Sequence, residues 1–162
     1  MMPQDFIQLL TGTVGSFGFS ILYNLRGRKL LIASLGGLLA WSIYLIFRTA
    51  VPDESLRYLI ASAVITVYAE VFARILKTPT TTFLVPSVIP LVPGSSLYYT
   101  MNYALNAQWL LFGQRALYTL QLALCIAVGI IAVTTLTRLR TMLIRKIRKQ
   151  AHLSHFHRDL KL

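Results

Sequence analysis

Four polar side chains recur at helical spacing in an otherwise apolar part of the sequence. At steps of four, three and four residues, they are Ser95, Tyr99, Asn102 and Asn106. On a helix of 3.6 residues per turn they fall within an arc of about 60°. Hydroxyl and amide groups that face lipid lack hydrogen-bond partners. We therefore expect this polar stripe to face a cavity or a partner helix.

The polar stripe follows a segment rich in proline and glycine, VPSVIPLVPGSS, which contains Pro86, Pro90 and Pro93. Proline removes a backbone donor and clashes with the preceding helical turn, so the segment predicts a broken helix. A helix restarting at Ser95 and Ser96 would point its first amides into the break, where its dipole favours an anion such as a carboxylate. The alternative is a kinked structural helix with interhelical hydrogen bonds. The predicted substrate-binding residues are Pro93, Gly94, Ser95, Ser96, Tyr99, Asn102 and Asn106.

One carboxylate, Glu70, lies within another apolar segment. It shares a helical face with Ser62, Thr66 and Arg74, at steps of four residues. An ionisable side chain inside a membrane helix is a functional candidate by default, and Glu70 could carry a coupling proton. The alternative is a structural ion pair with Arg74 near the end of the helix.

Residue patterns typical of enzymes and metal sites are missing from the sequence. The three histidines, His152, His155 and His157, all lie near the C-terminus, and Cys125 is the only cysteine. A serine–histidine–aspartate set, a phosphate-binding loop and a zinc-ligand spacing are all absent. We therefore expect a protein that is not an enzyme and that has no catalytic residue, no metal and no cofactor.

The composition indicates which elements position these residues. Of the 162 residues, 56% are hydrophobic and 13% are charged, whereas soluble domains average about 25% charged residues. Several apolar runs approach the 20 residues needed to cross a bilayer. The sequence thus predicts an all-α membrane protein with a five-span transmembrane domain, residues 1–137, and a basic cytoplasmic tail, residues 138–162. The five expected spans are 6–25, 30–47, 56–76, 80–105 and 116–136, the fourth being broken at its Pro/Gly segment.

The distribution of basic residues predicts the orientation. With five spans, one side of the membrane collects 13 of the 16 Lys and Arg residues, and the other side holds Arg48, Arg57 and Arg115. Positive residues accumulate on the cytoplasmic side, so we expect the N-terminus outside and the C-terminus in the cytoplasm. Omitting the fourth span would spoil this asymmetry, which favours its crossing despite the prolines. The formal charge of +11 therefore reflects topology and not nucleic-acid binding.

The tail combines an apolar face with many basic residues. Leu139, Met142, Leu143 and Ile147 lie near one face, with Arg and Lys around them. Such a helix is expected to extend the fifth span and then lie on anionic lipid. A helix that binds a protein partner is the alternative.

Small residues at helical spacing mark faces that can pack closely in lipid. They are Gly12, Ser16 and Ser20 in the first span, Ala33 and Gly37 in the second, and Ala123 and Ala127 in the fifth. Ordinary bundle packing explains them without any functional role.

The segment PSVIPLVPGSSLYYTMNYAL resembles the threonine/serine exporter family, with Pro86, Leu91–Val92, Pro93, Gly94 and Ser95 as its most specific match. The chain is more closely similar to the small membrane-only subunit of the split, two-protein form, one bacterial member of which is associated with succinate export. The resemblance implies proton-driven secondary export across the bacterial inner membrane. It also implies a partner subunit with its own membrane half and a cytoplasmic N-terminal part. It supplies no established residue roles.

Two functions remain open at this point. The first is a membrane subunit of a secondary transporter that exports small carboxylate-bearing metabolites, either threonine and serine or C4-dicarboxylates such as succinate. The second is a structural or assembly subunit for a partner that carries the transport site. A small channel is a weaker third possibility, because the sequence has no charged ring or recognisable filter. Expected partners are the second membrane subunit, the metabolite and lipid, with no nucleic acid.

Overall fold

Helix is the only regular structure in residues 3–159, whose backbone the computed structural model describes; side chains are described for residues 4–143. The all-α fold class is therefore confirmed over this range. The elements are α1 (Pro3–Leu22), α2 (Arg28–Ala50), α3 (Glu54–Ile75), α4 (Thr81–Val88), the 3₁₀ helix η1 (Ile89–Leu91), α5 (Gly94–Leu105) and α6 (Trp109–Asp159).

The turns between the first helices follow from residue type. Asn24 and Gly27 have φ angles of 55° and 57° in the turn from α1 to α2, a region that asparagine and glycine tolerate best. The Asp53 side chain caps α3 by accepting a hydrogen bond of 2.9 Å from the Ser55 amide. The turn from α2 to α3 is only three residues long, so these two helices must run antiparallel as neighbours.

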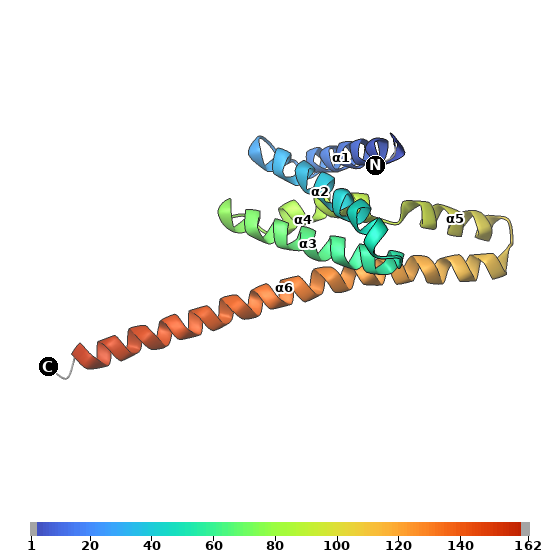
Figure 1. Cartoon of the computed structure of the whole chain (residues 1–162). Coiled ribbons are helices and arrows are strands. Elements are labelled where there is room, and N and C mark those ends of the chain that lie inside the picture. The colour runs from blue at the N-terminus through green and yellow to red at the C-terminus, as the bar shows by residue number, and fades with distance from the viewer. Residues whose placement is uncertain (1–2, 160–162) are drawn as a thin grey trace.

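Helix α2 lies at the centre of the arrangement, in contact with α1, α3 and α4 (Figure 1). Helix α6 packs along α3, whereas α5 packs mainly against α6. As Figure 1 shows, the hairpin made by α5 and the start of α6 projects beyond the N-terminal end of α3. The residues of the predicted site therefore lie partly outside the main bundle.

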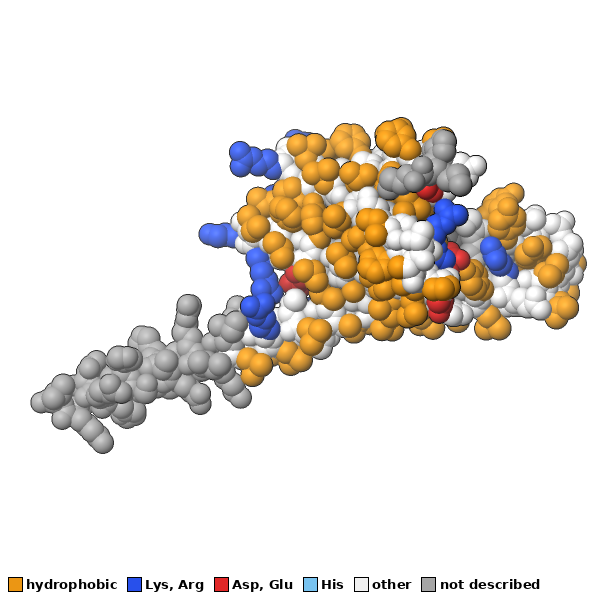
Figure 2. All heavy atoms as spheres, viewed as in Figure 1, with side chains coloured by type: hydrophobic (Ala, Val, Ile, Leu, Met, Phe, Trp, Pro, Cys, Tyr) orange, Lys and Arg blue, Asp and Glu red, His pale blue; other side chains and the backbone are white. Residues whose placement is uncertain are grey.

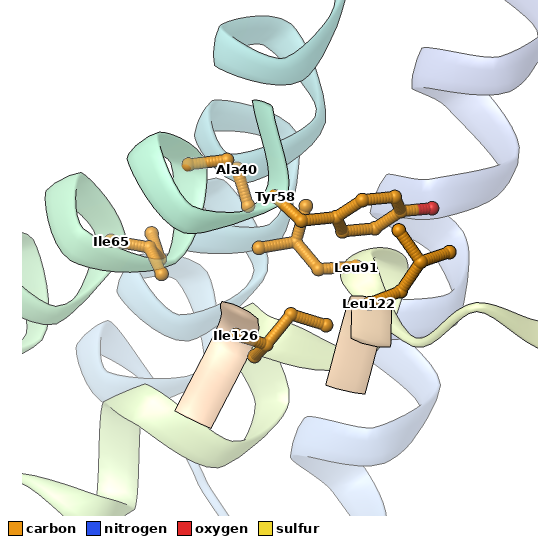
Figure 3. Packing of buried hydrophobic residues seen from close by; sticks show 7 residues of the cluster. Ala40, Tyr58, Ile65, Leu91, Leu122 and Ile126 are labelled. Atoms are coloured by element: carbon orange, nitrogen blue, oxygen red, sulfur yellow. The ribbon is translucent and has the colours of Figure 1, made fainter. Parts of the chain in front are cut away.

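The buried core joins α2, α3, η1 and α6 (Figure 3). Leu91 of η1 is fully buried, so the proline-rich segment contributes directly to the core. Within lipid, tight packing rather than removal of water holds helices together. The labelled members of this cluster are Ala40, Tyr58, Ile65, Leu91, Leu122 and Ile126.

Small residues allow the helices to approach closely. A Cβ atom added at Gly37 of α2 would collide with the Ser16 side chain of α1, and one at Gly36 would collide with Ser87 of α4. The predicted close packing is thus confirmed at the Ser16–Gly37 contact. On the other side of the bundle, a Cβ atom at Gly129 of α6 would meet Ser62 of α3.

Four helices in the described part of the chain are long and apolar enough to cross a membrane. They are Gln4–Leu22, Arg28–Ala50, Glu54–Ile75 and Trp109–Leu143. The expected fourth span is instead divided into α4, η1 and α5, and the apolar helical stretch Thr81–Leu91 alone is short. The multi-pass character is therefore supported, while the count of five spans stays a prediction.

Two boundaries differ from the expectation. Pro86 lies inside α4 without ending it, and the change of helix type comes at Ile89. Pro86 is the sixth residue of α4, beyond the first turn, so it removes one intrahelical hydrogen bond, and the helix ends two residues later at Val88. The last helix begins at Trp109, seven residues before the predicted span, and its backbone continues into the tail as far as Asp159. Of the expected apolar face of the tail, Leu139, Met142 and Leu143 are exposed, whereas Ile147 and the three histidines lie outside the residues whose side chains are described.

Basic side chains gather at one end of the molecule, where the α1–α2 and α3–α4 turns meet (Figure 2). Arg26 of the α1–α2 turn and Lys29 at the start of α2 line one pocket together with Thr78 and Pro79 of the α3–α4 turn. The orientation prediction requires these two turns to share a side of the membrane. Their proximity supports that requirement, and the orientation itself remains a prediction.

Candidate functional site

The chain changes direction immediately before α5. Val92 is extended, with φ −62° and ψ 124°, and Pro93 precedes the helix with φ −74° and ψ 62°. The backbone groups here are partly paired, because the Val92 amide donates to the Ile89 carbonyl at 3.1 Å and the Leu97 amide donates to the Pro93 carbonyl at 3.0 Å. Helix α5 begins at Gly94, one residue before the restart that the sequence predicts at Ser95 and Ser96.

The polar stripe lies on the exposed face of α5. All four of its members are exposed in this chain, and the Asn106 side-chain amide donates to the Asn102 backbone carbonyl at 2.9 Å and to its side-chain oxygen at 3.1 Å. Gly94 is exposed too, with no atom within 4 Å of an added Cβ. The described part of the chain thus keeps these residues together on one face but does not enclose them in a cavity.

Ser96 and Pro93 have a different environment from the stripe. Both are buried, and the Ser96 hydroxyl shares a hydrogen bond of 2.7 Å with the Thr119 hydroxyl of α6. Thr100 adds a contact of 3.2 Å to the same Thr119 oxygen. These bonds attach α5 to α6, so Ser96 has a visible structural role and is separated from the polar stripe.

Glu70 lies near the opposite end of the bundle. Its side chain is 15% exposed and pairs with Arg74 at 3.4 Å, which is the geometry of the structural alternative. The two residues line a pocket of about 200 Å³ together with α6 residues that include Thr137 and Arg138. The carboxylate is therefore accessible from this pocket, and a role in proton coupling stays a prediction.

A second polar cluster, which the sequence reading did not single out, adjoins the polar stripe. The Arg115 guanidinium of α6 lies 5.8 Å from the centre of the Tyr99 ring and 5.3 Å from that of Tyr118. The Tyr118 hydroxyl in turn hydrogen-bonds to Glu54, the first residue of α3. Sequence reasoning counted Arg57 and Arg115 only as topology charges. Arg57 lies inside the predicted third span, which was the available signal for it, whereas Arg115 lies just before the predicted fifth span and only the structure places it in a helix.

Comparison with known proteins matches the chain to a family model. The family model described as Threonine/Serine exporter, ThrE, matches residues 8–136, which include most of α1, all of α2 to α5 and most of the apolar part of α6. No curated protein and no solved structure matches the chain. The family is one of membrane transporters and not a class of enzymes, and membership is compatible with a partner subunit of the same family. The match extends over well more than half of the chain, so this protein belongs to the threonine/serine exporter family.

Proposed function

We propose that the chain is a membrane subunit of a secondary transporter that exports small carboxylate-bearing metabolites across the bacterial inner membrane. The observation that carries this proposal is the family match over residues 8–136, together with four helices of membrane-spanning length and composition. Threonine and serine are the substrates that the family description names. C4-dicarboxylates such as succinate share their carboxylate chemistry.

The start of α5 is the proposed contact for the substrate carboxylate. Gly94 and Ser95 are exposed at this helix N-terminus, where backbone amides and the helix dipole favour negative charge. The hydroxyl and amide groups of Tyr99, Asn102 and Asn106 continue the polar surface along the helix. Serine and threonine carry a hydroxyl group that such a surface can hydrogen-bond.

A partner subunit is proposed to complete the site. Helix α5 packs mainly against α6, and its polar stripe is open in this chain. Polar groups exposed to lipid would be costly. A partner membrane subunit that covers the stripe would convert an open face into an enclosed path. The basic tail is proposed to rest on anionic lipid at the cytoplasmic surface.

Glu70 is the proposed site of proton coupling. A carboxylate in the last third of α3 that pairs with Arg74 can exchange a proton from the adjoining pocket. Protonation would weaken its attraction to Arg74 and release the ion pair. Release of the Glu70–Arg74 ion pair would alter the contact between this end of α3 and the part of α6 that lines the same pocket.

The alternative is an assembly subunit whose partner transports alone. The open polar stripe favours this alternative to the same extent, because a purely structural interface also needs exposed polar groups. In that case Asn102→Ala would weaken assembly without changing the affinity of the complex for substrate. In the transporter subunit it would change both transport and affinity.

Vesicle transport separates these functions. Vesicles containing both subunits, this chain alone or the partner alone are loaded with radiolabelled threonine, serine or succinate, and efflux is followed with and without a proton gradient. The proposal expects gradient-dependent efflux only when both subunits are present. Efflux by the partner alone, with unchanged substrate affinity, would establish the assembly role instead.

A further inference from the structure

The second polar cluster is centred on Glu54, at the end of the bundle away from the basic turns. The Tyr44 hydroxyl of α2 donates to Oε1 of Glu54 at 2.9 Å, and the Tyr118 hydroxyl of α6 donates to Oε2. Both carboxylate oxygens therefore have neutral donors from different helices. The cluster joins α2, α3 and α6 at the end where the α5–α6 hairpin leaves the bundle (Figure 1).

Two arginines lie against the tyrosines of this cluster. Arg57 lies 5.1 Å from the centre of the Tyr44 ring, and Arg115 lies 5.3 Å from that of Tyr118. The two ion pairs in the described part of the chain involve Arg48 and Arg74 instead. The charges of Arg57 and Arg115 are therefore held next to aromatic rings and are not matched by a carboxylate contact within the described residues.

The cluster also contains buried donors without acceptors. Among the described residues, Nε of Arg57 and Nε of Arg115 are buried and have no hydrogen-bond partner. The indole nitrogen of Trp41 is in the same situation, and its ring stacks on Tyr44 at 4.7 Å. Buried donors in folded proteins are normally paired. Three unpaired donors around one set of tyrosines point to an acceptor that is supplied from outside the chain.

We propose that Arg57 and Arg115 bind the carboxylate of the transported metabolite, a role that rests on the export function proposed above. The guanidinium group presents its donors in a fork that matches the two oxygens of a carboxylate. Glu54 accepts hydrogen bonds from Tyr44 and Tyr118, and the ion pairs found among the described residues do not join it to either arginine. With two guanidinium groups and one carboxylate, the cluster keeps a net positive charge for an incoming anion.

The position of the cluster connects it with the polar stripe. Arg115 also lies over the Tyr99 ring at 5.8 Å, so one residue of the cluster contacts one residue of the stripe. A carboxylate that moves along α5 can pass directly to Arg115. In the predicted orientation this end faces outward, so the cluster is the release end of the export path.

The test is direct binding to the complex of both subunits in lipid nanodiscs. Radiolabelled threonine and radiolabelled succinate are the probes, and threoninol, in which an alcohol replaces the carboxylate, is the competitor. Arg57→Gln and Arg115→Gln are each expected to raise the Kd of the bound probe about 10-fold or more, the usual effect of losing a hydrogen bond to a charged group. Threoninol is expected to compete weakly with the wild type and equally weakly with both variants.

Arg48→Gln is the matched control. It removes the same charge at the same end of the bundle, but Arg48 pairs with Asp5 at 3.4 Å and does not belong to the cluster. Its Kd should stay within about twofold of the wild-type value, because exposed ion pairs contribute little. Arg57→Lys and Arg115→Lys keep the positive charge but lose the forked pair of donors of the guanidinium group. Variants whose thermal unfolding matches the wild type should therefore bind the probes with intermediate affinity.

The outcomes separate this site from the wider function. If the wild-type complex binds neither probe, both proposals fail. If the wild type binds and both Gln variants keep the wild-type Kd, or if Arg48→Gln weakens binding equally, the arginine site is wrong while export stands. Loss confined to threonine or to succinate supports the site and also identifies which carboxylate it takes.

Discussion

Gly94 is the residue where the proposed carboxylate contact is most open to test. An added Cβ meets no atom within 4 Å, so a larger side chain there is tolerated by this chain itself. We predict that Gly94→Leu lowers efflux about tenfold or more, equivalent to losing at least about 1.4 kcal/mol of binding free energy, because leucine blocks the first amides of α5. Efflux from vesicles and thermal unfolding of the same preparation are the measurements.

Gly18→Leu is the control for Gly94→Leu. Gly18 lies in α1, is exposed and likewise has no atom within 4 Å of an added Cβ. The Gly18→Leu variant should export substrate at the wild-type rate. Equal efflux by the two variants would remove the start of α5 from the substrate path.

Glu70 allows a test of proton coupling at a single residue. We predict that Glu70→Gln abolishes uphill export driven by a proton gradient but preserves exchange of substrate between equal concentrations, because glutamine cannot take up and release a proton. Arg74→Gln breaks the same ion pair and leaves the carboxylate in place. If the two variants have the same phenotype, the ion pair is structural and Glu70 does not couple export.

At the scale of elements, the contact between α1 and α2 depends on the absence of a side chain. A Cβ atom at Gly37 would collide with Ser16, whose side chain is fully buried. We predict that Gly37→Ala destabilises the protein by about 1–3 kcal/mol, the usual cost of overpacking a filled core. Thermal unfolding in detergent measures this effect.

Gly15→Ala provides the comparison on α1, since an added Cβ there has open space around it. Its stability should be unchanged or slightly higher, because alanine favours helix more than glycine does. Equal melting temperatures for the Gly15 and Gly37 variants would contradict the close α1–α2 contact.

The α5–α6 hairpin is held together by a hydrogen bond between its two helices. Ser96 and Thr119 share a buried hydrogen bond of 2.7 Å, and large apolar side chains such as Leu105 and Trp109 are exposed around the hairpin tip. Since α5 packs mainly on α6, its other faces are left uncovered by this chain. A partner subunit or lipid must cover them.

At the scale of the whole molecule, the path of α4, η1 and α5 decides the topology. If this composite segment crosses the membrane, residues 79 and 108 lie on opposite sides; if it does not, they share a side. In a Cys125→Ser background, we predict that Gln108→Cys reacts with a membrane-impermeant thiol reagent in intact cells. Pro79→Cys should react only after permeabilisation. Both residues are exposed, and Cys125 is the only native cysteine.

The same experiment has a clear contrary result. If both engineered cysteines react from the same side, four spans are present and the fourth predicted crossing is wrong. The 13-to-3 division of basic residues would then need another explanation, because the third connection and the C-terminal tail would no longer share a side.

The sequence by itself determined the properties that depend on neighbouring residues. Long apolar runs specify helices because the backbone must satisfy its own hydrogen bonds in lipid, and Pro93 with Gly94 specifies where α5 starts. The spacing of Ser95, Tyr99 and the two asparagines put them on one face, as the structure shows.

Only the tertiary structure decided which faces meet. Ser96 and Thr119 are 23 residues apart, and Glu54 and Tyr118 are 64 residues apart, yet each pair is in hydrogen-bond contact. Such contacts depend on how each helix is rotated and shifted along its neighbour. The rotation and the shift of an apolar helix are hard to predict from its own sequence, because its lipid-facing and buried sides have similar residues. The cluster around Glu54 therefore became visible only after α2, α3 and α6 were packed together.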